Sequence, residues 1–132
     1  MSRSLIYTVN ANPQTVDANG NVALGTVIRR FGCNLNLIGN GIMVRSQGYY
    51  SIDTVIVAVP DAVGDITATF YMDGVPIPGA TATGTATAVG DYVTLPIIGV
   101  VREMCCDSAG TLTCVLSAAA TVNNIAVKVT KD

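Results

Sequence analysis

Short runs of alternating apolar and polar residues recur along the chain and predict β-strands. In residues 66–72, "ITATFYM", apolar side chains alternate with threonine and tyrosine, the period-2 pattern of a half-buried strand. Residues 125–131, "IAVKVTK", repeat it. Residues 51–59, "SIDTVIVAV", begin as alternation and end apolar on both sides, which is typical of a central strand covered by another layer, and Pro60 is expected to end that strand. No segment has convincing helical periodicity.

Residues suited to tight turns separate these runs at short intervals. The predicted turns are "DANGN" (17–21), "GNG" (39–41), "SQG" (46–48), "PDAVGD" (60–65), "DG" (73–74), "VGD" (89–91), "DSAG" (107–110) and "VNN" (122–124). Short strands with such turns predict one all-β domain over residues 1–132, a sandwich or barrel, in which residues 1–30 form a strand-and-turn extension available for attachment.

The segment "GATATGTATAVG" (79–90) is built almost entirely from glycine, alanine and threonine. Threonine favours strands, so the segment is expected to be a strand bent or bulged at Gly84; an exposed edge strand or a mobile loop is the alternative. Small side chains let a neighbouring backbone come close. Thr81, Thr83 and Thr85 are therefore candidate residues of an interface with a partner subunit.

Composition indicates an oligomer, because 50% of the residues are hydrophobic and only 12% are charged, against about 25% in an ordinary soluble domain. The net charge of −2 provides no basic field for nucleic acid. The sequence contains no run of about 18 apolar residues, so no membrane-spanning helix is predicted. The N-terminus lacks the apolar stretch of a signal peptide, so synthesis and assembly in the cytoplasm are expected.

Enzymatic chemistry finds little support in the sequence. The chain has no histidine, which excludes Ser-His and Cys-His nucleophiles. The four cysteines, Cys33, Cys105, Cys106 and Cys114, match no zinc spacing and are expected to be mostly free thiols rather than a structural disulfide. Asp61 and Asp65 share one loop, but two acids are few for calcium, and turn capping is the favoured interpretation. No catalytic residue, metal or cofactor is predicted.

A family resemblance covers residues 39–132. "GIMVRSQGYYSIDTVIVAV" (41–59), followed by "ATFYMDGVPIPGA" (68–80), "YVTLPIIGVVRE" (92–103) and "LTCVLSAAATVNNIAVKVTKD" (112–132), resembles the tumour necrosis factor and complement globular-head superfamily, most closely the compact versions on bacterial spores and bacteriophages. The resemblance implies a jelly-roll sandwich of two antiparallel sheets, assembled as a homotrimer.

Charged and aromatic pairs are further interface candidates. Arg29 and Arg30 are neighbours that would point to opposite faces of a strand, where either could pair with Glu103 or an aspartate of a partner; a solvated pair is the alternative. Tyr49 and Tyr50 should likewise diverge, one into the core and one outward.

A free-standing trimeric head predicts a non-enzymatic structural role. We expect a decoration protein on a bacteriophage capsid or another particle, located in the virion and placed where three-fold symmetry matches its own. The alternative is a receptor- or glycan-binding tip on a separate fibre or bacterial surface structure.

Overall fold

Eleven strands make up the described part of this computed structural model, which comprises residues 4–32, 35–45, 48–103 and 110–131. The strands are β1 (Ser4–Asn10), β2 (Gln14–Val16), β3 (Thr26–Phe31), β4 (Leu35–Ile38), β5 (Gly41–Val44), β6 (Gly48–Pro60), β7 (Gly64–Met72), β8 (Val75–Ala86), β9 (Val93–Glu103), β10 (Gly110–Leu116) and β11 (Ala120–Lys131). No helix long and apolar enough to cross a bilayer occurs in these ranges.

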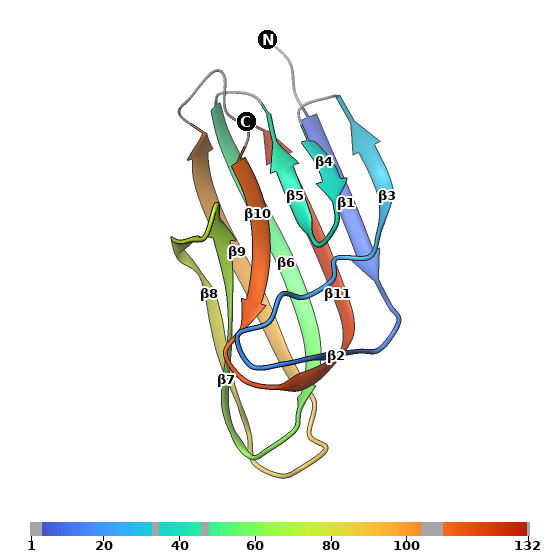
Figure 1. Ribbon diagram of the computed structural model, residues 1–132, viewed down its shortest axis with the longest axis vertical. Helices are drawn as coiled ribbons and strands as arrows, with labels where there is room; N and C mark the ends of the chain where they lie inside the picture. Colours follow the sequence, from blue (N-terminus) through green and yellow to red (C-terminus); the bar gives the residue numbers. More distant parts are fainter. Residues whose placement is uncertain (1–3, 33–34, 46–47, 104–109, 132) are drawn as a thin grey trace.

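The strands form two antiparallel sheets that pack face to face (Figure 1). Sheet A has the order β3-β1-β11-β6-β9, with the short β2 paired to the start of β11, and sheet B has the order β4-β5-β10-β7-β8. The prediction of an all-β sandwich of two antiparallel sheets is confirmed. The predicted turns at residues 46–48 and 107–110 lie mostly outside the described residues, and Cys33, Cys105 and Cys106 lie wholly outside them.

The first strand is built into the middle of sheet A. β1 lies between β3 and β11, and its register places Ser4 opposite Lys131 at one end and Asn10 opposite Ile125 at the other. Residues 4–31 therefore contribute three strands to the sandwich. A role of this region in attachment stays a prediction.

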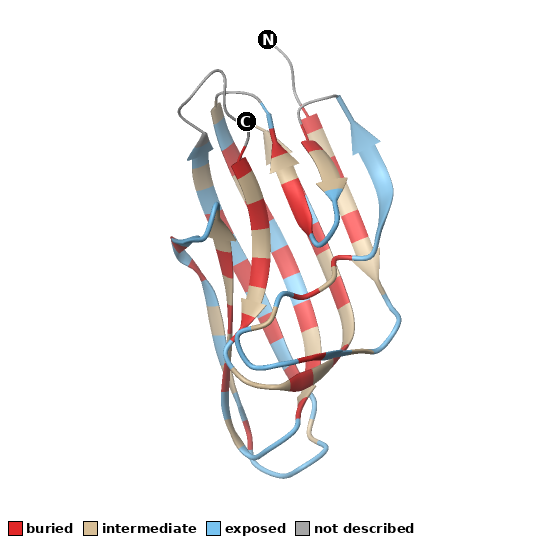
Figure 2. Cartoon of the chain, in the orientation of Figure 1, coloured by how far each residue is buried: buried red, intermediate tan, exposed pale blue. Residues whose placement is uncertain are grey.

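Alternation places one face of each main strand in the core. On β7, the buried Ile66, Ala68 and Phe70 alternate with half-buried threonine and tyrosine, as predicted. On β11, Ile125, Val127 and Val129 point inward in the same way. Figure 2 shows the resulting banded pattern along the strands of both sheets. Burial of this apolar surface is the main source of folding free energy.

A segment between β2 and β3 closes one end of the core. Val22 N donates to Cys114 O over 2.9 Å and Asn19 N to Leu116 O over 2.8 Å, which ties the segment to β10 of sheet B, while β2 is paired to sheet A. The Gln14 side-chain amide exchanges two hydrogen bonds with the backbone of Ala23, of 2.8 and 2.9 Å. These bonds hold Val16, Val22 and Leu24 inside, so the segment joins the two sheets at that end.

Most predicted turns in the described ranges are confirmed. Asp73 and Gly74 have φ values of 53° and 83° and form a two-residue hairpin between β7 and β8, the geometry that Asp-Gly favours. The predicted turn at residues 122–124 is wrong. This segment lies inside β11, where a register shift against β6 between Val122 and Asn124 absorbs it as a β-bulge.

Residues 79–86 of the glycine-, alanine- and threonine-rich segment form the second half of β8, an edge strand paired with β7, and residues 87–90 follow it in a turn. The bulge predicted at Gly84 is wrong, because Gly84 pairs regularly with Ile66 and the register shift lies between Thr69 and Tyr71. Position 84 requires a small residue for a different reason, the close approach of β9. A Cβ on Gly84 would overlap the Val93 side chain of β9, and one on Gly99 of β9 would lie 2.7 Å from Ala80 Cβ. The two sheets thus approach closely where β8 and β9 meet.

We expect Gly84→Ala to lower the free energy of unfolding by about 1–3 kcal/mol, because the added methyl group forces β8 away from Val93. Urea denaturation measures the change. Thr83→Ser, at the neighbouring outward position, keeps the hydroxyl that faces Thr67 Oγ1 and should shift it by no more than about 0.5 kcal/mol. Equal stability of Gly84→Ala and the wild type would show that the two strands do not need this close contact.

Candidate interaction surface

The outer face of sheet A is the most distinctive surface of the molecule. Strands such as β6 and β9 carry apolar side chains on the side that faces the core and also on the side that faces water. On β6, the buried Ile52, Thr54, Ile56 and Ala58 alternate with outward residues that include Val55 and Val57. The outward residues of the four longest strands are Leu5, Tyr7 and Val9 on β1; Ala126, Lys128 and Thr130 on β11; Tyr49, Ser51, Asp53, Val55 and Val57 on β6; and Thr94, Pro96, Ile98, Val100 and Arg102 on β9. We call this set the outer A face.

Several apolar side chains of the outer A face are well exposed in the single chain, and the others are half-buried. The exposed fraction is 74% for Ile98, 58% for Val100 and 43% for Val55. The second apolar side of β6, which the sequence predicted to be covered by another layer, is therefore open in one chain. A contiguous apolar patch of this kind marks an interaction site.

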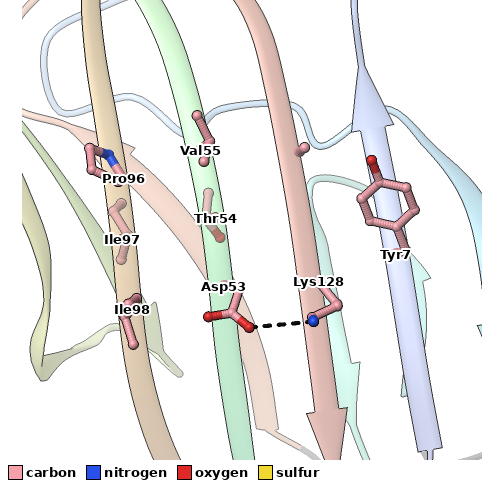
Figure 3. A pocket seen from close by; sticks show the side chains of 9 residues that line it. Tyr7, Asp53, Thr54, Val55, Pro96, Ile97, Ile98 and Lys128 are labelled. Atoms are coloured by element: carbon pink, nitrogen blue, oxygen red, sulfur yellow. Dashed lines mark ion pairs between the residues drawn. The ribbon is translucent and has the colours of Figure 1, made fainter.

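A shallow hollow of ≈ 380 Å³ lies on the outer A face (Figure 3). Its residues come from β1, β11, β6 and β9, and they are Tyr7, Asp53, Thr54, Val55, Pro96, Ile97, Ile98, Ala126 and Lys128. The strand register places Tyr7, Lys128, Asp53 and Ile98 side by side in one row across the sheet. Lys128 Nζ lies 3.6 Å from Asp53 Oδ2, so the hollow combines an apolar lining with one ion pair.

The edge strand β3 extends the exposed surface. All six of its residues are exposed, and Val27, Ile28 and Phe31 are large and apolar. Arg29 lies opposite Tyr7 and Arg30 opposite the buried Ile6, so the two arginines occupy opposite faces as predicted. Arg30 Nε donates to Leu35 O over 3.1 Å, and Arg29 Nη1 donates to Ile28 O over 3.1 Å.

Interface ion pairs of the two arginines stay a prediction. Within the described part of the chain, neither arginine pairs with a carboxylate, and the Glu103 side chain lies outside it.

Tyr49 and Tyr50 diverge as the sequence predicted. Tyr50 is completely buried in its own chain, whereas Tyr49 is 53% exposed and the Arg102 guanidinium lies 5.6 Å from its ring centroid. Tyr92 is also exposed, but it precedes β9, whereas Tyr49 pairs with Arg102 near the other end of that strand. The two exposed tyrosines therefore do not form a joint aromatic platform.

Thr81, Thr83 and Thr85 lie on the opposite surface, the outer face of sheet B. Thr83 Oγ1 lies 2.8 Å from Thr67 Oγ1, Thr81 Oγ1 lies 3.0 Å from Thr69 Oγ1, and Thr85 Oγ1 donates to Asp65 Oδ1 over 2.6 Å. These cross-strand bonds form a polar ladder along β7 and β8. Their role in a subunit interface stays a prediction.

The titratable groups in the described ranges do not gather into a metal site. No three His, Cys, Asp or Glu residues in these ranges lie close enough to hold a metal ion. Asp65 accepts the hydroxyl of Thr85, and Asp91 accepts from Thr87 Oγ1 and Ala88 N, so both carboxylates act within their own loops and hairpins. Cys114 is a buried free thiol, and burial raises its pKa from 9.0 to about 12, which keeps it neutral and unreactive.

Comparison with solved structures identifies the fold. The chain is similar to murine APRIL (TM-score 0.78, 14% identity, covering 99% of this chain and 100% of that one). It is also similar to Eiger TNF from S. frugiperda (0.70, 8%, 98% and 91%) and to the globular domain of zebrafish complement 1qA (0.69, 6%, 98% and 96%). No protein-family model and no curated protein matches the sequence.

The chain therefore has a tumour necrosis factor and C1q-like jelly-roll fold, as the resemblance implied, while the bacteriophage or spore type stays a prediction. Sequence reasoning did not select Ile98, Pro96 or Val100 as site residues. The sequence did contain a signal for these residues, because residues 95–101, "LPIIGVV", are apolar at both odd and even positions. A strand with this pattern is apolar on both faces, so one apolar face is exposed unless another layer or subunit covers it.

We expect Cys114 to resist iodoacetamide at neutral pH in the folded protein and to react in guanidinium chloride, because its thiol is buried and neutral. Peptide mass mapping distinguishes it from the other cysteines. The raised pKa also lowers stability as the pH rises from about 9 to about 12, since the unfolded chain loses this proton first. Cys114→Ala should remove that component of the pH dependence. Rapid native labelling of Cys114 would contradict its burial.

Proposed function

We propose that this chain is a non-enzymatic structural protein that assembles into homotrimers and decorates the surface of a bacteriophage particle. The observation that carries the proposal is the outer A face, a wide apolar surface that one copy of the chain leaves open to water.

A second and third copy of the chain are the proposed cover of the outer A face. Proteins of this fold typically trimerise. The chain carries few charges. Association would remove apolar area of the exposed Ile98, Val100 and Val55 from contact with water, and this burial favours assembly by about 25 cal/mol per Å² before the entropic cost of association. In a closed three-fold ring each copy contributes two different patches, so the outer A face would contact another part of the neighbouring copy.

The opposite surface supports the same orientation. The threonine ladder of β7 and β8 satisfies its hydroxyls within the chain and stays compatible with water. With each outer A face turned toward the three-fold axis and covered by part of the neighbouring copy, the outer face of sheet B would form the outside of the trimer.

A passive role is supported by the chemistry of the described residues. Proteins of this fold are typically non-enzymatic. The described carboxylates form no cluster that could hold a metal ion, and the buried Cys114 thiol is neutral. The alternative role, a glycan- or receptor-binding tip, is less well supported, because the exposed Tyr49 and Tyr92 lie apart and form no stacking platform.

We expect the purified protein to elute as three chains by size-exclusion chromatography with light scattering, and Ile98→Asp to shift the mass to one chain. The introduced carboxylate would be buried without a partner, which weakens association on the order of 100-fold or more. Thr83→Asp, on the outer face of sheet B, is the matched control and should remain three chains. Dissociation by Thr83→Asp with an intact Ile98→Asp oligomer would move the interface to the threonine face.

Location on a particle tests the decoration role. In electron micrographs of a bacteriophage that encodes this chain, antibody-gold label should lie over the capsid, and the protein should occupy positions of three-fold symmetry. Label at the ends of tail fibres would support the receptor-binding alternative. Absence of the protein from purified particles would exclude both roles.

A further inference from the structure

One ion pair interrupts the apolar outer A face. Lys128 Nζ on β11 lies 3.6 Å from Asp53 Oδ2 on β6, and the two residues are directly opposite in the strand register. Their side chains are 49% and 53% exposed, so each is half in contact with water in the single chain. Figure 3 shows the pair between Tyr7 on one side and Ile98 on the other.

The neighbours of the pair are uncharged. The adjacent row across the sheet, on one side, consists of Val9, Ala126, Val55 and Pro96, which are all apolar. The adjacent row on the other side contains Leu5, Thr130, Ser51 and Val100. On the three inner strands of sheet A, Lys128 and Asp53 are the only charged residues at outward positions, since Arg29 and Arg102 lie on the edge strands β3 and β9.

Covering the outer A face with another copy would remove most of the remaining water from this pair. Two charges that stay paired tolerate such burial, whereas one charge without its partner is strongly unfavourable. The pair adds little to affinity, because well-packed apolar residues of similar volume usually hold an interface as well or better. Its effect is on geometry, since the pair keeps unsatisfied hydrogen-bonding capacity that a neighbouring copy must meet with a polar group, and a copy docked in a shifted position would place an apolar side chain there instead.

We propose that the Lys128–Asp53 pair determines the register in which copies of this chain pack, so that one stoichiometry forms instead of several. This inference rests on the proposed assembly through the outer A face. It assigns the pair to specificity, a use of buried polar groups that is known from interfaces whose register a single polar residue fixes.

Native mass spectrometry over a range of protein concentrations tests the proposal. Wild-type protein should give a single species of three chains. The double variant Asp53→Leu/Lys128→Met, which replaces the pair by apolar side chains, should associate at similar or lower concentrations but as a mixture of stoichiometries. Asp61→Asn, which removes a carboxylate from the β6–β7 turn outside the face, is the matched control and should behave as wild type.

Single variants provide the second measurement. Asp53→Leu or Lys128→Met leaves one charge without its partner, and either should weaken association on the order of 100-fold or more, with recovery in the double variant. If the double variant does not fold by circular dichroism, Asp53→Val/Lys128→Leu, which is also apolar, takes its place and should likewise give mixed stoichiometry.

Two results would overturn the inference while leaving the proposed trimer intact. A double variant that forms only three-chain species would show that the pair does not set the register. A folded double variant that stays monomeric would show that the pair provides affinity. A wild-type monomer at every concentration would overturn both the assembly and this inference, so the wild-type stoichiometry distinguishes the two failures.

Discussion

Strands of sheet A are apolar on both faces, and a two-layer sandwich can cover only one of them. On β6 and β9 the inward residues, such as Ile56 and Leu95, are completely buried against sheet B, while Val55 and Ile98 point into water. The exposed apolar area is a property of the strands themselves, because neither strand can turn a residue from one face to the other without shifting its register. The open face, the hollow on it and the proposed assembly all follow from this constraint.

The two outer faces of the sandwich meet water differently. Sheet B presents threonine hydroxyls that bond across β7 and β8, so its polar groups are satisfied without a partner. At the shared edge, Gly84 and Gly99 allow β8 and β9 to approach until side chains and backbone are in contact. The outer face of sheet B is thus polar along β7 and β8, whereas the outer A face and the neighbouring edge strand β3 expose apolar side chains.

The described charged residues lie in two kinds of surroundings. Few charged residues exist, and three of the described carboxylates, those of Asp65, Asp73 and Asp91, accept hydrogen bonds from nearby hydroxyl and backbone amide groups. The Lys128–Asp53 pair differs from them because it lies in the middle of an apolar surface. A charge pair in that position costs desolvation when covered, which is why specificity explains it better than affinity does.

Local sequence patterns determined which residues form strands, which face of each strand points inward and where most hairpins turn. Period-2 alternation correctly placed Phe70 and Val127 in the core, and Asp73–Gly74 adopts the left-handed conformations that its residues favour. Only the tertiary structure decided which strands are neighbours, because pairing joins residues far apart in the chain. It made residues 122–124 a bulge instead of a turn, placed Gly84 against Val93, and brought Lys128 to Asp53 on an open apolar face.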